Sequence, residues 1–208
     1  MKPLFLALGV AATSIFVASP VAHLDHHLLT AHMAQHLGLM LIAAPLILRG
    51  APSIVSRWRP HPVFCWLAGT LTVLVWHVPA IFQLALQSNF CHMFEQASFL
   101  IAGILFWWPV KRPGAGTARS DWSVPLYLFF ATLPCDALSA FLVFCGHVVY
   151  THYLMGMGNS RLTPLEDQEL AGALMWVTVT FAYLVPALVV TTRLLSGERE
   201  RAVAEGVC

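Results

Sequence analysis

The stretch LAGALMWVTVTFAYLVPALVVTTRL at residues 170–194 decides the fold class of this chain. Its only charged residue is Arg193, and it reaches the roughly 20 apolar residues that an α-helix needs to cross a bilayer. Acidic residues precede it and basic residues follow it: Glu166, Asp167 and Glu169 before, Arg199 and Arg201 after. Because basic residues mark the cytoplasmic side of a membrane protein, the stretch predicts a transmembrane helix that ends in the cytoplasm.

The composition of the whole chain agrees with a membrane protein. Of its 208 residues, 58% are hydrophobic and 10% are charged, whereas soluble domains have about 25% charged residues. So few polar groups cannot cover a surface that faces water, and we expect the lipid bilayer to be the solvent. The net charge of +1 gives no reason to expect a nucleic-acid partner. The cysteines form no C-x-x-C pair, and most lie in apolar runs, which is typical of buried filler.

Six apolar stretches have about the length of a membrane span. They therefore predict an all-α fold, a polytopic transmembrane helical bundle of six spans. The approximate boundaries of the stretches are Leu4–Ala22, Ala31–Leu48, Pro62–Leu86, Phe90–Val110, Ser123–Tyr150 and Leu170–Leu194.

The connections between these stretches alternate in charge. Ten of the eleven lysines and arginines lie before the first stretch, at the end of the last one or beyond it, or in the loops 49–60 and 111–121, while Arg161 alone lies on the other side. The positive-inside rule then predicts that both chain termini are cytoplasmic.

The first stretch has two interpretations. Lys2, a short apolar run and small residues near Ala22 suit either a first transmembrane helix or a cleavable signal peptide, which would leave five spans. We divide the chain accordingly into residues 1–22 (first helix or signal peptide), 23–195 (membrane-embedded domain) and 196–208 (cytoplasmic tail).

Nine of the ten histidines lie on the side opposite the basic loops. Among them, His32 and His36 share a helix face with Met40, because the three are spaced by four residues. Two imidazoles at this spacing can bind one metal ion, and an added thioether favours Cu(I). The alternative is that both histidines only form hydrogen bonds at the membrane surface. Met33 and Met175 also lie in the outer half, where flexible apolar filler is the ordinary role of methionine.

Three further histidines are candidate metal ligands with open alternatives. His77 lies within the third stretch, where an ionisable residue is usually functional, although it could instead bond to a carbonyl freed by Pro79. His92 shares a helix face with Glu95 and Gln96, so the carboxylate could orient a metal-binding ring or only charge the first helical turn. His147 lies at the outer end of the fifth stretch, close to His152, Met155 and Met157.

Known catalytic motifs are absent from the sequence. It contains no Walker loop, no dinucleotide fingerprint, no G-x-S-x-G elbow and no H-E-x-x-H motif. We therefore do not expect an enzyme.

Four stretches of the chain carry a family resemblance. They read AHMAQHLGLMLIAAP at 31–45, WHVP at 76–79, FWWPV at 106–110 and PLEDQELAGALMW at 164–176. On these motifs, which extend over about residues 31–195, the chain resembles the CtaG-like cytochrome c oxidase assembly factors, multi-span proteins of bacterial respiratory membranes. It does not resemble the single-span copper chaperone that shares this name.

The resemblance implies a function, a location and a set of residues. The expected function is assembly of a haem–copper oxidase, with Cu(I) bound and delivered at the periplasmic face of the bacterial inner (plasma) membrane and with oxidase subunits as partners. A homo-oligomer is also compatible. His32, His36, His77 and His92 lie on family motif positions, and Asp167, Gln168 and Met175 belong to the last motif. The family often has Glu-His where this chain has Glu95-Gln96, so another group, such as His147, would replace that histidine.

Two other functions remain open on the sequence. Histidines on different spans, such as His77 with His36 or His92, could hold a b-type haem in an electron-transfer protein. Alternatively, the chain could be a scaffold that binds oxidase subunits without any metal.

Overall fold

A computed structural model describes residues 2–18, 24, 27–111, 122–154 and 162–204, and these ranges contain helices and no strand. The prediction of an all-α fold is confirmed. The helices are α1 (Pro3–Ala18), α2 (Leu29–Leu37), η2 (Gly38–Ala43), α3 (Ala44–Gly50), α4 (Pro52–Arg57), α5 (Pro62–Trp76), α6 (Pro79–Gln87), α7 (Asn89–Lys111), α8 (Ser123–Phe144), η3 (Thr151–Leu154) and α9 (Pro164–Ala204). Here η2 is a π-helical segment and η3 is a short 3₁₀ turn.

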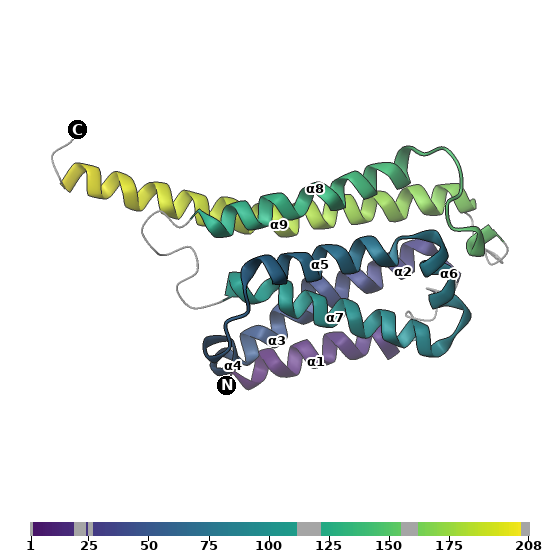
Figure 1. Ribbon diagram of the computed structural model, residues 1–208, viewed down its shortest axis with the longest axis horizontal. Coiled ribbons are helices and arrows are strands. Elements are labelled where there is room, and N and C mark those ends of the chain that lie inside the picture. The colour runs from purple at the N-terminus through teal and green to yellow at the C-terminus, as the bar shows by residue number, and fades with distance from the viewer. Residues whose placement is uncertain (1, 19–23, 25–26, 112–121, 155–161, 205–208) are drawn as a thin grey trace.

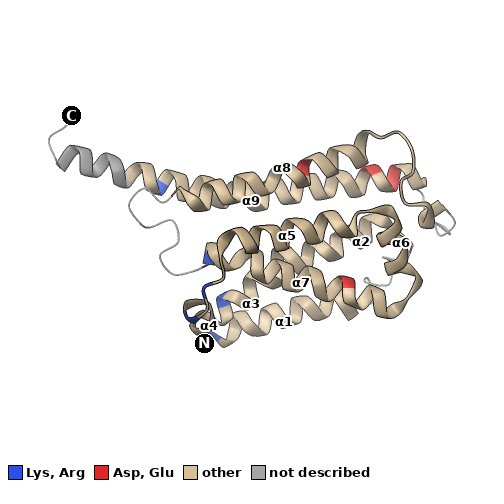
Figure 2. Ribbon diagram, viewed as in Figure 1, with Lys and Arg blue, Asp and Glu red and all other residues tan. Residues whose placement is uncertain are grey.

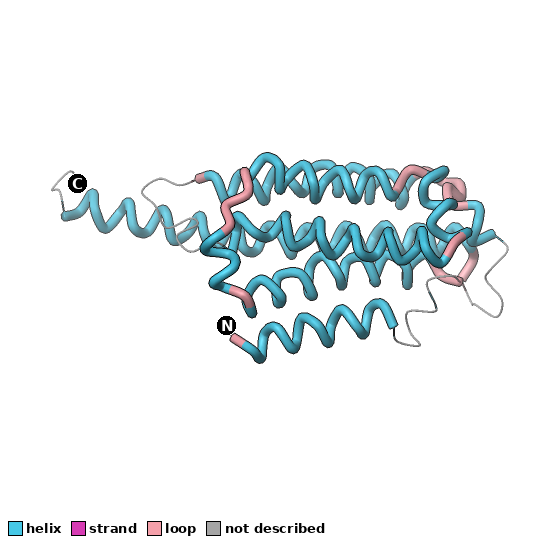
Figure 3. Tube along the Cα trace, turned by 60° about the horizontal axis from the view of Figure 1, so that its bottom comes forward, coloured by secondary structure: helices cyan, strands magenta, loops and turns pink. Residues whose placement is uncertain are grey.

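The long helices run along one common direction, and the loops gather at the two ends of the bundle (Figures 1 and 3). Helices α8 and α9 form an antiparallel pair that packs across α2 and α5, while α1 packs on α3 and η2. Helix α9 extends beyond the rest of the bundle at its C-terminal end (Figure 1). The buried core therefore lies where α2, α5, α7, α8 and α9 meet.

By length and composition, fewer helical segments of the described chain qualify as membrane spans than the six that the sequence predicts. Four continuous helical segments of the described chain qualify: Leu29–Gly50, Asn89–Lys111, Ser123–Phe144 and Pro164–Ser196. Helices α5 and α6 make a fifth if they are counted as one broken span, since they meet at an angle of 78°. Helix α1 has 16 residues, about 24 Å at 1.5 Å per residue, which is shorter than the roughly 30 Å hydrocarbon core. Six spans thus stay a prediction.

The outer surface of the bundle is apolar, as a bilayer requires. Large side chains such as Phe90, Phe144 and Phe181 are exposed by 77%, 74% and 65%. Apolar exposure on this scale is rare on proteins that face water. The chain is therefore a membrane protein.

Charged residues divide between the two ends of the bundle (Figure 2). Lysines and arginines of the described residues gather around α4, the N-terminus, the end of α7 and the C-terminal part of α9, whereas the acidic residues on α7 and at the start of α9 lie toward the other end. This separation agrees with the alternating loops in the sequence. It also places the candidate metal ligands away from the basic end.

Two glycines allow helices to approach closely. A Cβ atom on Gly50 would lie 2.5 Å from the backbone nitrogen of Leu6, so only glycine lets α1 meet the end of α3. A Cβ atom on Gly103 would lie 2.9 Å from Cα of Met40, which sets α7 directly against η2. The second contact matters for the site, because α2 and α7 supply its main residues.

The helix that contains α2, η2 and α3 is widened in its middle. The π-helical η2 follows His36 by two residues, and π-helical turns occur mostly at functional sites. The indole Nε1 of Trp107 on α7 donates to the carbonyl of Met40 over 3.0 Å. This bond ties the widened turn to α7 and helps to hold α2 and α7 in register.

Candidate metal centre

Three polar side chains from α2 and α7 converge on one buried point. Nε2 of His32 lies 2.8 Å from Nε2 of His36, and these nitrogens lie 3.3 Å and 3.2 Å from Oε1 of Glu95. The exposed fractions of the three residues are 0%, 4% and 0%. The spacing of four residues on α2 puts both rings on one face, as predicted, and Glu95 reaches them from α7.

The two distances to Glu95 suit a metal ion, while the 2.8 Å between the two imidazoles is that of a hydrogen bond. Ligand atoms held at about 2.0–2.1 Å from a tetrahedral zinc or copper ion lie about 3.3 Å apart. A hydrogen bond between two imidazoles requires one nitrogen to be the acceptor, so at least one of His32 and His36 presents a lone pair. An imidazole nitrogen with a lone pair and a neighbouring carboxylate together provide two potential ligands for a metal ion.

The charge of Glu95 also points to a cation. Among the described residues, its ion pairs are with the histidines His32, His36 and His92 and none is with a lysine or arginine. A buried carboxylate in a membrane needs a positive partner, because its desolvation is otherwise too costly. That partner is either a proton on a histidine or a metal ion, and both bind at the same atoms.

His92 contacts the opposite oxygen of the same carboxylate. Its Nδ1 lies 3.4 Å from Oε2 of Glu95, and its Nε2 lies 2.6 Å from Nε2 of Gln96, which donates to it. Gln96 therefore holds the His92 ring in place one turn along α7. His92 is a further candidate ligand, since ligand atoms of His32, His92 and Glu95 lie within 4.8 Å of one another.

His77 lies at the break between α5 and α6 and is 7% exposed. Its Nδ1 donates to the carbonyl of Val73 over 2.7 Å, and its Nε2 is buried without a hydrogen-bond partner in the described chain. Metal-binding histidines are commonly fixed in this way, with one ring N–H on a backbone carbonyl and the other nitrogen directed at the metal. A bond to a backbone carbonyl is present, but the Val73 carbonyl also accepts from the backbone N–H of His77 and is not one that Pro79 frees. This bond leaves Nε2 of His77 available to a ligand.

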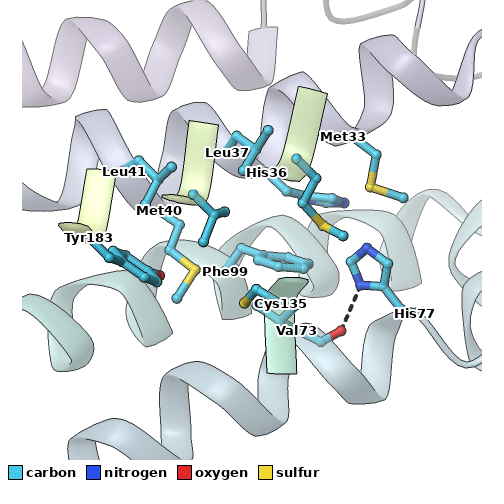
Figure 4. A pocket seen from close by; sticks show the side chains of 12 residues that line it. Met33, His36, Leu37, Met40, Leu41, Val73, His77, Phe99, Cys135 and Tyr183 are labelled. Atoms are coloured by element: carbon cyan, nitrogen blue, oxygen red, sulfur yellow. Dashed lines mark hydrogen bonds between the residues drawn. The ribbon is translucent and has the colours of Figure 1, made fainter. Parts of the chain in front are cut away.

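A cavity of about 30 Å³ lies beside the cluster, where α2, η2, α5, α7, α8 and α9 meet. This volume holds one or two water molecules. Figure 4 shows His77, His36, Met33 and Met40 around it, with the Cys135 sulfur on the opposite side. Met40 thus shares the cavity with His36 and does not belong to the triangle of His32, His36 and Glu95.

The first turn of α9 fixes the helix that carries the two histidines. Oδ2 of Asp167 accepts from the backbone N–H of Leu29 over 2.6 Å, and Oδ1 accepts from Thr30 N–H over 3.2 Å and from the Thr30 hydroxyl over 2.7 Å. The adjacent Gln168 accepts from Val149 N–H and donates to the carbonyl of His147. Both residues of the last motif are therefore anchors, and Asp167 caps α2 only three residues before His32.

The structure does not bring His147 into the cluster. Its ring is exposed, and Nδ1 donates to the carbonyl of Cys145 over 2.8 Å in the loop after α8. His152 lies in η3, with its ring 5.4 Å from that of Tyr153. The histidines His23 and His26, together with Met155 and Met157, lie outside the described residues.

Sequence reasoning missed the direct contact of Glu95 with His32 and His36, and it treated Met33, Cys135 and Met175 as filler. A carboxylate inside an apolar span, three residues after a histidine, is the signal that could have indicated Glu95. No local sequence pattern indicates that Met33, Cys135 and Met175 line one cavity, because this depends on how α2, α8 and α9 pack together.

The comparisons with known proteins address the whole chain. The chain is similar to uncharacterized proteins of Mycobacterium bovis (Mb0105) and Mycobacterium tuberculosis (MT0111), each 20% identical over 95% of this chain and 34% of the relative. It is also similar to the uncharacterized protein ML1998 of Mycobacterium leprae, 19% identical over 90% of this chain and 32% of the relative. The chain thus spans about a third of the length of these curated relatives. No solved structure matches it significantly.

A family model gives the identification. The description of the cytochrome c oxidase caa3 assembly factors (Caa3_CtaG) matches residues 2–196, a range that contains every residue of the cluster and of the cavity. The match extends from α1 through the membrane-spanning part of α9, and it confirms the resemblance seen in the sequence. This chain belongs to the cytochrome c oxidase caa3 assembly factor family.

Proposed function

We propose that this membrane protein binds copper on the cluster of His32, His36 and Glu95 at the outer end of the bundle and delivers it to a subunit of a haem–copper oxidase. The observation that carries the proposal is the convergence of two imidazole nitrogens and a carboxylate oxygen within 3.3 Å at a fully buried point. Copper is cargo here, and the role is not catalytic. The bacterial inner membrane is the proposed location, with the basic end of the bundle in the cytoplasm.

The surroundings of the cluster favour copper over zinc. A structural zinc site is closed by four ligands, whereas this cluster has three direct ligands and a fourth candidate, His92, held to one side by Gln96. A site with few ligands releases its ion more readily, as delivery requires. Thioethers also lie next to His36, and sulfur ligands select copper.

The geometry gives no support to a b-type haem at these histidines. The haem hypothesis pairs His77 with His36 or His92, and His77 and His36 both line one small cavity. This cavity holds about 30 Å³, while pockets for ligands of drug size have about 300–1,000 Å³. We expect the purified protein to show no Soret band in its optical spectrum. A Soret band that follows the protein in stoichiometric amount would favour the haem instead.

Replacing Glu95 with glutamine tests the copper proposal. The change keeps the shape of the side chain but removes the charge that attracts the cation, so we expect copper affinity to fall by about 100-fold, the upper end of what supporting groups of metal sites contribute. The measurement is chelator competition on the purified protein, together with the copper content of the oxidase formed in cells that carry the variant.

The matched control is Glu166→Gln. Glu166 is exposed and accepts from Thr163 at the start of α9, so this variant loses the same charge without touching the cluster. Copper affinity should then equal that of the wild type. If Glu95→Gln binds copper as tightly as Glu166→Gln does, the cluster is not the copper site.

A further inference from the structure

The cavity beside the cluster has a chemical character of its own. Besides His36, four sulfur atoms and a second imidazole line it from separate parts of the chain: Met33 and Met40 on α2 and η2, His77 after α5, Cys135 on α8 and Met175 on α9. The exposed fractions of these five residues lie between 2% and 7%. Three of the seven methionines of the chain thus face one space of about 30 Å³.

The buried nitrogen of His77 distinguishes this cavity from a gap in apolar packing. The Val73 carbonyl holds the proton on Nδ1, so Nε2 carries a lone pair and has no hydrogen-bond partner among the described residues. An unpaired polar atom at this depth is costly. A ligand that accepts the lone pair removes the cost, and Figure 4 shows the ring at the wall of the cavity beside Met33.

The lining selects the kind of ion. It contains thioethers, a thiol and imidazoles but no carboxylate. Soft sulfur ligands favour Cu(I). In addition, the cost of burying an ion rises with the square of its charge, so a cavity with neutral ligands suits a monovalent ion better than a divalent one.

His36 separates the cavity from the cluster. Its Nε2 belongs to the triangle with His32 and Glu95, while its side chain lines the cavity. The ring of Phe99 stacks on it at a centroid distance of 3.9 Å and also lines the cavity. Two groups of side chains of different chemistry, one with a carboxylate and one with sulfur, therefore adjoin at a single imidazole.

We propose that the cavity is a second, soft metal site, which holds one Cu(I) on Nε2 of His77 and the sulfur atoms of Met33, Met40 and Met175, with Cys135 close by. The identity of the ion as Cu(I) cargo rests on the proposed function. The inference that the cavity binds a soft monovalent ion does not rest on the proposed function, because it follows from the lining of the cavity alone. The site deepens the proposed function, since an ion that moves past His36 exchanges carboxylate and imidazole ligands for sulfur.

The experiment uses Ag(I), which is monovalent and soft but stable to oxidation, on the purified full-length protein in detergent. The variant Met33→Leu/Met175→Leu removes two sulfur atoms at nearly constant volume, a kind of change that cores tolerate. We expect it to bind one Ag(I) fewer per chain than the wild type, or to bind that ion at least about tenfold more weakly. The control is Met93→Leu, because Met93 is 67% exposed on the outside of α7, and it should match the wild type.

Glu95→Gln separates this site from the cluster. It should keep the Ag(I) that the methionine variant loses, while the copper affinity of the cluster falls. X-ray absorption of the Ag(I)-loaded wild type should show sulfur neighbours, a result that needs no variant to fold. Equal Ag(I) binding by Met33→Leu/Met175→Leu and Met93→Leu, or an Ag(I) spectrum without sulfur, would overturn the proposal. If the methionine variant alone loses Ag(I) while Glu95→Gln leaves oxidase copper unchanged, the soft site stands and the proposed function fails.

Discussion

The double variant His32→Ala/His36→Ala is expected to lose copper binding at the cluster and to leave the oxidase without copper. It removes two of the three atoms that converge within 3.3 Å. Supporting groups around metal sites contribute 10–100-fold in affinity, so the loss of two direct ligands should weaken binding by about 10³-fold or more, which is about 4 kcal/mol. The measurements are copper stoichiometry after mild purification and the copper content of the oxidase in the same cells.

The double variant His147→Ala/His152→Ala is the matched comparison. It removes the same number of imidazoles from the loop after α8, where His147 is exposed. We expect its copper content to remain at the level of the wild type, with unchanged helix content in both variants. A normally metallated oxidase in the His32→Ala/His36→Ala strain would instead favour a scaffold that works without metal.

The second large effect is expected from Asp167→Ala. This change deprives the N–H groups of Leu29 and Thr30 of their carboxylate acceptor at a position that is fully buried. Hydrogen bonds to a charged group contribute about 1.5–3 kcal/mol each, so we expect the free energy of unfolding to fall by about 3 kcal/mol or more. Unfolding in mixed micelles measures it, and copper affinity should fall as well, because the first turn of α2 carries His32.

Asp136→Asn provides the comparison for Asp167→Ala. Asp136 also joins two helices, since it accepts from the Thr180 hydroxyl over 3.1 Å between α8 and α9. An amide oxygen can still accept this one bond, so we expect a change below about 1 kcal/mol. If Asp167→Ala is no less stable than Asp136→Asn, the carboxylate does not hold α2 in place.

Much of the fold was predictable because membrane helices are set by local composition. The apolar stretches correspond to the long helices, and the alternation of basic and acidic loops agrees with the charge separation between the two ends. The bend of 78° after Trp76 was not predicted. Pro79 indicates a kink, but the size of a bend depends on what receives the carbonyls that the proline leaves unpaired.

The site was predictable only in its local part. The spacing of His32 and His36 on one helix predicts that their rings meet, and they do. The position of Glu95 beside these rings depends on how closely α7 approaches η2. Gly103 permits this close approach, and no sequence pattern along α2 indicates it. The cap by Asp167 lies beyond sequence reasoning for the same reason, since 138 positions separate it from Leu29.

The length of α9 has a mechanical consequence for the cap that Asp167, in the first turn of α9, provides for α2. Helix α9 has 41 residues, about 60 Å at 1.5 Å per residue, and its far end projects past the bundle on the basic side (Figure 1). Hydrogen bonds do not survive displacements as large as one residue of helical rise. A force that drew α9 along its own axis by this distance would release the start of α2 at the other end of the protein. Axial movement of this long helix and the position of two imidazoles are thus connected without any contact between the protruding end and the cluster of His32, His36 and Glu95.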